Sequence, residues 1–194
     1  LAPLGLGLSG SNAWAVHGSR TTSGAPLIAG DPHRAFESPN VYYQTGLALT
    51  DEPVDAAGFA FPGVPGIGHF GQNISTAWAV TNAMADYQDL FIERLADAVT
   101  GRRLETIEVR GANTIEIECL LTRHGPIVSD ATAGIGLALA STGFDLPAGS
   151  LAAVIPQLRA RTADELDTAL AAWVEPVNNF VLADARGTIA YRTG

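Results

Sequence analysis

The chain has 194 residues, 47% of them hydrophobic, which is enough apolar material for the core of one domain or of a part of one. Its formal net charge is −9 and no basic stripe is present, which argues against a nucleic-acid partner. No apolar run reaches the length of a membrane span, and Cys119, the single cysteine, cannot form an internal disulfide.

The greater part of the chain is typical of short strands separated by turns. Thr22-Ser23-Gly24 separates the first two strands, which we expect to form a hairpin, and Pro62 to Gly66 is expected to be a loop. The clearest hairpin surrounds Gly111-Ala112-Asn113, because polar and apolar residues alternate on both sides of this turn. The strands predicted here are 13–16, 26–29, 41–49, 57–61, 77–81, 90–95, 105–110, 114–121 and 135–140.

A helix is predicted late in the chain, where Thr162 and Glu165 form a capping box. Pro176 ends the helical pattern, and strands at 177–183 and 189–191 follow. The residues that share the apolar face of this helix are Leu166, Ala169, Leu170 and Trp173. The pattern is α+β with mainly antiparallel sheet. The tryptophans expected in the core are Trp14, Trp78 and Trp173.

The step from Gly10 to Ser11 carries the main functional signal. If this peptide bond breaks, Ser11 becomes an N-terminal residue, and an α-amine titrates at about pH 8 in model peptides. The neutral amine can take the hydroxyl proton, directly or through a water molecule, and so turn Ser11 into a nucleophile. Gly-Ser-Asn is common in loops, so this interpretation needs support from the remainder of the chain.

Further motifs follow the Gly-Ser step in a fixed order. The blocks are Ser11–Val16, Gly30–His33, Phe61–Gly66, Thr76–Ala83, Ala85–Leu90, His124–Pro126 and Asn179–Asp184. Together they resemble, over nearly the whole chain, the beginning of the β-chain of the penicillin acylase family. Members of this family are N-terminal nucleophile amidohydrolases, and they include penicillin, cephalosporin and acyl-homoserine lactone acylases.

The resemblance implies a four-layer αββα fold made from a precursor that cleaves itself just before the serine. Residues 1–10 would then be a linker or propeptide remnant, and residues 11–194 an incomplete, β-rich N-terminal part of the β-chain. The α-chain and the rest of the β-chain would be its partners. Similar proteins are commonly periplasmic or secreted, but the opening residues lack the basic segment of an intact signal peptide.

The resemblance assigns catalytic roles to four positions. Ser11 matches the nucleophile, and His33 matches a supporting histidine close to it in cephalosporin and homoserine lactone acylases. The backbone N–H of Asn82 and the side-chain amide of Asn179 match the two donors to the oxyanion. Because Asn178 is adjacent, the resemblance leaves open by one residue which of the two asparagines is the second donor. A turn made by the two asparagines and a locally bonded loop histidine are the structural alternatives.

A calcium site is implied at Asp86, Gln88 and Asp89, through two carboxylates and a backbone carbonyl. Calcium takes a high number of oxygen ligands, so the two carboxylates need further ligands, which would come from the α-chain. A solvated acidic turn is the alternative. The calcium would be structural, and no organic cofactor is expected.

The expected function is hydrolysis of the amide in an N-acylated small molecule, such as a β-lactam antibiotic or an acyl-homoserine lactone. The acyl group stays open, because much of the pocket would come from other segments. Two alternatives belong to other classes: a family-like binding or structural domain without catalysis, and an inert fragment of an active enzyme. By itself, this piece is expected to be inactive.

Overall fold

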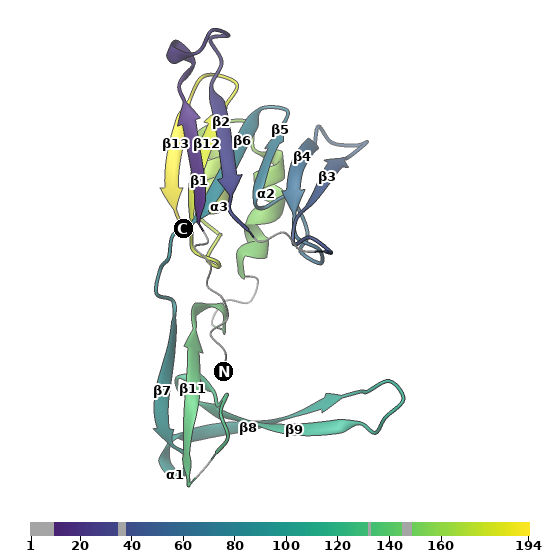
Figure 1. Ribbon diagram of the computed structural model, residues 1–194, viewed down its shortest axis with the longest axis vertical. Helices are drawn as coiled ribbons and strands as arrows, with labels where there is room; N and C mark the ends of the chain where they lie inside the picture. The colour runs from purple at the N-terminus through teal and green to yellow at the C-terminus, as the bar shows by residue number, and fades with distance from the viewer. Residues whose placement is uncertain (1–9, 35–37, 132, 145–148) are drawn as a thin grey trace. The chain divides into compact units, whose positions relative to one another are not determined.

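The computed structural model describes residues 10–34, 38–131, 133–144 and 149–194 (Figure 1). Contacts within the chain divide it into two compact units. Unit 1 comprises residues 1–85 and 148–194, and unit 2 comprises residues 86–147. All four candidate catalytic residues therefore lie in unit 1, and the three candidate calcium ligands lie at the start of unit 2.

Unit 1 is built on a six-stranded antiparallel sheet with the strand order β13-β12-β6-β5-β4-β3. The neighbours β6 and β12 are far apart in sequence, yet they pair from Asn82↔Asn178 to Thr76↔Asp184. The strands are β3 (Tyr43–Ala48), β4 (Asp55–Ala60), β5 (Phe70–Asn73), β6 (Thr76–Asn82), β12 (Asn178–Asp184) and β13 (Ile189–Thr193).

The hydrophobic core lies between one face of this sheet and two helices, α2 (Val154–Arg159) and α3 (Ala163–Leu170). Residues of β6 and β12 alternate between the two faces, and every second one points to the helices. The fully buried core side chains include Trp78, Val80, Phe180 and Leu182 from the sheet, and Leu166 and Leu170 from the helices.

The capping box at the start of α3 is only partly as expected. The Thr162 hydroxyl accepts a hydrogen bond from the Glu165 N–H at 3.1 Å, but the Glu165 carboxylate accepts from the Arg161 N–H instead of from the cap residue. Helix α2 was not predicted from the sequence. This helix contains Pro156 in its first turn, where a missing N–H costs nothing.

A two-stranded hairpin, β1 (Ser11–Val16) and β2 (Leu27–Pro32), packs on the other face of the sheet, against β6 and β12. A Cβ on Gly30 would come within 2.2 Å of the Phe70 ring and 3.2 Å of the Ala79 Cβ, so only glycine allows this approach. Trp14 points from the opposite side of the hairpin and is 49% exposed, so its predicted place in the core is wrong. The short 3₁₀ turns of unit 1 are η1 (Gly18–Arg20) and η3 (Gly149–Ala153).

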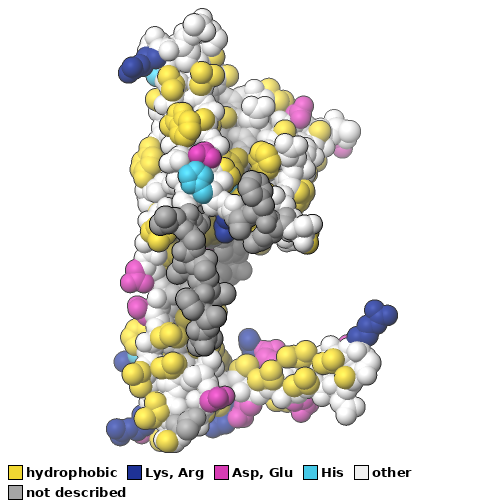
Figure 2. Space-filling model, in the orientation of Figure 1, with side chains coloured by type: hydrophobic (Ala, Val, Ile, Leu, Met, Phe, Trp, Pro, Cys, Tyr) yellow, Lys and Arg dark blue, Asp and Glu magenta, His cyan; other side chains and the backbone are white. Residues whose placement is uncertain are grey.

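Unit 2 consists of two small antiparallel sheets, β11-β7 and β10-β9-β8. Figure 2 shows hydrophobic side chains in a row along the β8–β9 hairpin, where Ile107, Ile115 and Ile117 are about half exposed. In the described part of the chain, no helix has the length and apolar character that crossing a membrane requires. The elements are β7 (Gln88–Arg94), α1 (Leu95–Ala98), β8 (Val99–Ile107), β9 (Ile115–Thr122), β10 (Gly125–Pro126), β11 (Ile135–Ser141) and η2 (Thr142–Phe144).

The predicted α+β class with mainly antiparallel strands is confirmed. Unit 1 stacks a helix layer, a sheet and a second, two-stranded sheet layer, which are three consecutive layers of an αββα sandwich.

Candidate active site

Ser11 is the first residue of β1, opposite Pro32 of β2. Its side chain shares a face of the hairpin with Ala13 and Gly30, because directly paired residues and residues two apart in a strand point the same way. Gly30 lies against Ala79 of β6. The Ser11 hydroxyl is therefore on the side of the hairpin that faces the six-stranded sheet.

His33 lies on the opposite face of the hairpin, in a cluster of polar side chains. Its Nε2 atom is 2.9 Å from Asp31 Oδ2, and the same oxygen accepts a hydrogen bond from Asn12 Nδ2 at 3.3 Å. The hydrogen bonds from His33 and then Asn12 hold the pKa of the Asp31 carboxyl below its usual value. The structure thus places the His33 ring beside the Gly10–Ser11 junction but not on the side of the serine hydroxyl.

Asn82 ends β6. Its side-chain oxygen accepts a hydrogen bond from the Met84 N–H at 2.7 Å, and Met84 has a φ of +55°, so the chain turns sharply here. The backbone N–H of the next residue, Ala83, donates a hydrogen bond to the backbone oxygen of Val177 at 3.1 Å. Because N–H groups alternate in direction along an antiparallel strand, the Asn82 N–H points away from β12. This direction is compatible with the role of an oxyanion donor.

Asn179 lies on β12, directly opposite Thr81 of β6, and its side chain points to the face that the hairpin covers. Its Nδ2 atom donates to the Thr81 hydroxyl at 3.2 Å. Its Oδ1 atom lies 2.6 Å from the Tyr191 hydroxyl and 3.0 Å from the Thr193 hydroxyl. Asn178 is 5% exposed and points to the opposite, helix-covered face. Of the two asparagines, only Asn179 faces the layer that carries Ser11.

The three chain segments meet at one end of unit 1. Figure 1 shows the beginning of β1, the end of β6 and the beginning of β12 at this same end, and β1 packs against both other strands. The candidate nucleophile thus lies on the layer next to the sheet that carries Asn179 and the turn at Asn82, at the same end of unit 1.

The candidate calcium ligands lie in an exposed part of unit 2. Asp86 precedes β7, and Gln88 and Asp89 pair with Ser141 and Ala140 of β11. Within the described ranges, no group of three or more His, Cys, Asp or Glu side chains could hold a metal ion. These residues alone therefore do not form a complete calcium shell, and the calcium stays a prediction that depends on ligands from elsewhere in the precursor.

A partly buried aromatic cluster next to β2 was not predicted from the sequence. His69 Nε2 is 2.9 Å from the Tyr42 hydroxyl, and Arg34 Nε donates to the same hydroxyl at 3.3 Å. The rings of Phe61 and Phe70 pack edge-on against the imidazole. Burial, together with the nearby Arg34 charge, lowers the pKa of His69 from 6.5 to about 4, so this imidazole is neutral at pH 7. No spacing rule in the sequence indicates such a cluster, because its members meet only in the fold.

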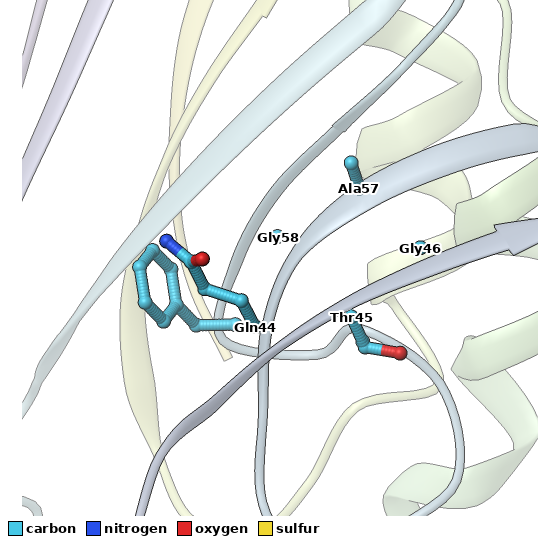
Figure 3. Close-up of a pocket in the computed structure, with 6 residues that line it drawn as sticks. Gln44, Thr45, Gly46, Ala57 and Gly58 are labelled. Carbon is cyan, nitrogen blue, oxygen red and sulfur yellow. The ribbon is translucent and has the colours of Figure 1, made fainter.

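A shallow hollow of about 370 Å³ lies over β3 and β4 (Figure 3). None of the candidate catalytic residues lines it, and β4 is separated from β6 by β5. We therefore do not place the reaction in this hollow. Its lining residues are Gln44, Thr45, Gly46, Ala57, Gly58 and Phe59.

Comparisons with known proteins agree with this architecture. The chain is 38% identical to penicillin acylase 2 proenzyme of Pseudomonas sp. (strain SE83), over 94% of this chain and 25% of that proenzyme. It is 33% identical to the acyl-homoserine lactone acylase QuiP of Pseudomonas aeruginosa, over 65% of this chain and 16% of that protein.

Among solved structures, the thermostable penicillin G acylase from Alcaligenes faecalis matches with a TM-score of 0.75 and 25% identity, over 93% of this chain and 34% of that chain. The chain thus spans only a quarter to a third of the lengths of these two penicillin acylases. The model of the penicillin amidase family matches residues 2–194. The chain belongs to the penicillin amidase family.

Proposed function

We propose that the full-length protein cleaves itself between Gly10 and Ser11 and then hydrolyses the amide bond of an N-acylated small molecule. The observation that carries this proposal is the meeting of three segments at one end of unit 1. There, Ser11 faces the sheet that presents the Asn179 amide and the backbone turn at Asn82.

The proposed reaction uses the α-amine of the liberated Ser11 as its base. The amine takes the hydroxyl proton, and the Ser11 oxygen attacks the carbonyl carbon of the substrate amide. The Asn82 N–H and one N–H of the Asn179 side chain hold the oxyanion. Collapse of this intermediate expels the amine product, which takes the proton from the α-ammonium. Water then attacks the acyl-enzyme, with the α-amine again as base, and releases the carboxylic acid. His33 has a supporting role through Asp31 and Asn12.

The substrate class follows from the relatives. One is named for penicillin and another for acyl-homoserine lactones, so we propose a β-lactam with an acylated amine or an acyl-homoserine lactone as the substrate. Because the chain spans a quarter of the penicillin acylase proenzyme, we also propose that the other segments of the precursor complete the pocket. The structural calcium at Asp86, Gln88 and Asp89 belongs to the same proposal, and no organic cofactor takes part.

The test uses the full-length precursor. Intact-mass measurement of the purified wild type should find a chain that begins at Ser11, and a Ser11→Ala precursor should stay uncleaved. A Ser23→Ala variant, altered in the exposed hairpin loop, is the matched control and should be processed normally. Mixing the mature enzyme with substrate should release a burst of amine equal to the enzyme concentration. Amide hydrolysis by a mature chain that runs unbroken through Gly10–Ser11 contradicts the proposal.

A further inference from the structure

The carbonyl group at the proposed cleavage site has a defined hydrogen-bond donor. The Gly10 oxygen accepts a hydrogen bond from the backbone N–H of His33 at 2.9 Å. This contact extends the β1–β2 ladder by one pair beyond Ser11↔Pro32. Since hydrogen-bonded and non-hydrogen-bonded pairs alternate, the Ser11 nitrogen points away from β2. In the Gly10–Ser11 peptide, the oxygen is therefore hydrogen-bonded to β2, whereas the nitrogen points to the opposite edge of β1.

We propose that the His33 backbone N–H is the oxyanion donor for self-cleavage of the chain; this inference rests on the cleavage assigned above to the Gly10–Ser11 bond. The Ser11 oxygen adds to the Gly10 carbonyl carbon and gives up its proton, so that the negative charge develops on the Gly10 oxygen. The carbon–nitrogen bond then breaks, and the Ser11 nitrogen takes the proton. The resulting ester reacts with water to give a Gly10 carboxylate and a free Ser11 hydroxyl and amine. A hydrogen bond to an oxygen strengthens when that oxygen becomes charged, so the donor favours the transition state over the peptide.

The surrounding residues hold this donor in place. On one side of the hairpin, the His33 ring is fixed near Asp31 at 2.9 Å. On the other side, Phe70 fills the space over Gly30. Arg34, which follows His33, donates a hydrogen bond to the Tyr42 hydroxyl. The segment from residue 30 to residue 34 is thus anchored through both faces. A donor that does not have to reorganise during the reaction contributes most to catalysis.

Replacement of one backbone N–H by an ester oxygen tests the proposal. Cell-free translation of the full-length precursor can insert the α-hydroxy analogue of histidine at position 33, which keeps the imidazole and removes only the N–H. The matched control carries the α-hydroxy analogue of leucine at position 27. Leu27 and Val16, at the far end of the hairpin, form a hydrogen-bonded pair of the same type as His33 and Gly10, because such pairs alternate along the ladder.

The rate of precursor cleavage is followed on gels and by intact mass. We expect the ester at position 33 to slow cleavage on the order of tenfold or more relative to the ester at position 27. Equal rates for the two esters overturn the inference. A wild-type precursor that is never cut before Ser11 overturns the proposed function itself, so the two failures are distinguishable.

A measurement without the ester covers the case in which that variant does not fold. In the uncleaved Ser11→Ala precursor, the His33 N–H should exchange with solvent deuterium at least about tenfold more slowly than in the mature enzyme, since cleavage frees the Gly10 segment from this donor. Exchange of the His33 N–H at the same rate in both forms contradicts the inference.

Discussion

The Tyr191 hydroxyl donates a hydrogen bond to the Oδ1 atom of Asn179 across the β12–β13 pair, at 2.6 Å. Thr193, on the same strand as Tyr191, places its hydroxyl 3.0 Å from the same oxygen. With its oxygen held from β13, the amide group of Asn179 presents its nitrogen toward β6, where one hydrogen goes to Thr81. A side-chain amide carries two such hydrogens, so the second can serve the oxyanion. Tyr191 is therefore a positioning residue for the proposed donor.

Removal of this hydroxyl should reduce turnover without affecting folding. For Tyr191→Phe in the processed full-length enzyme, we expect kcat to fall about tenfold with KM unchanged. Without the Tyr191 hydroxyl the Asn179 amide is free to rotate, which weakens its hydrogen bond to the oxyanion, and this bond forms only in the transition state. Tyr191 is 66% exposed, so the melting temperature should hardly change. Tyr43→Phe, at another exposed tyrosine, is the matched control. A kcat for Tyr191→Phe equal to that of the control contradicts the positioning role.

The two proposed oxyanion donors should respond differently to alanine. Asn179→Ala removes the donor itself and should lower kcat about a hundredfold or more, the usual cost of one oxyanion-hole donor. Asn82→Ala keeps the backbone N–H and loses only the bond to Met84, so its loss of kcat should be clearly smaller. Steady-state kinetics on both processed variants checks the order. A larger loss for Asn82→Ala than for Asn179→Ala would mean that the donor assignment is wrong.

Local pattern predicted most of the strands but not all of the elements. The hairpin around Gly111 and the helix after Thr162 follow from alternation and capping, which are properties of neighbouring residues. The short strand β5 has no alternating pattern, and α2 is masked by Pro156 in its first turn. Trp14 was misplaced because the exposed face of β1 looks as apolar in sequence as a buried one.

The candidate site could be predicted only as a set of positions. Resemblance indicated Asn82 and Asn179, but their placement side by side depends on the pairing of β6 with β12, which joins residues about a hundred positions apart. The same pairing separates Asn178 from Asn179 by strand face, which composition and spacing do not encode. The contact of Tyr42 with His69 is likewise set by the sheet and not by sequence distance.

His69 should make the protein less stable as the pH falls below neutrality. The native imidazole binds a proton only near pH 4, whereas the unfolded one does so near 6.5. Between these values the unfolded state takes up more protons, so the free energy of unfolding decreases as pH falls, by about 3 kcal/mol in all. The contribution of His69 is fully present above pH 6.5 and is lost toward pH 4.

The matched variant for this pH dependence is His69→Phe, which keeps an aromatic ring in the cluster but does not titrate. Melting temperatures of the full-length protein and of this variant are compared from pH 7 to pH 4. We expect the wild type to lose more stability than the variant over this range. Parallel curves would show that the protonation of His69 does not differ between the folded and unfolded states.

Asp184 should be a major contributor to the stability of unit 1. Its buried carboxylate accepts hydrogen bonds from the backbone N–H groups of Ala163, Arg186 and Thr188 at 2.9 to 3.0 Å, and so joins the start of α3 to the turn after β12. Burial alone would raise the pKa of Asp184, but these hydrogen bonds outweigh it and lower the pKa.

Asp184→Ala leaves three donors without this acceptor and should cost about 3 kcal/mol or more of the free energy of unfolding. Asp164→Ala, at an exposed carboxylate in the first turn of the same helix, should cost about 1 kcal/mol or less. The difference in melting temperature between the two variants measures the effect, and it should shrink in acid, where the low-pKa carboxylate no longer favours the folded state. Equal melting temperatures at pH 7 would contradict this account of Asp184.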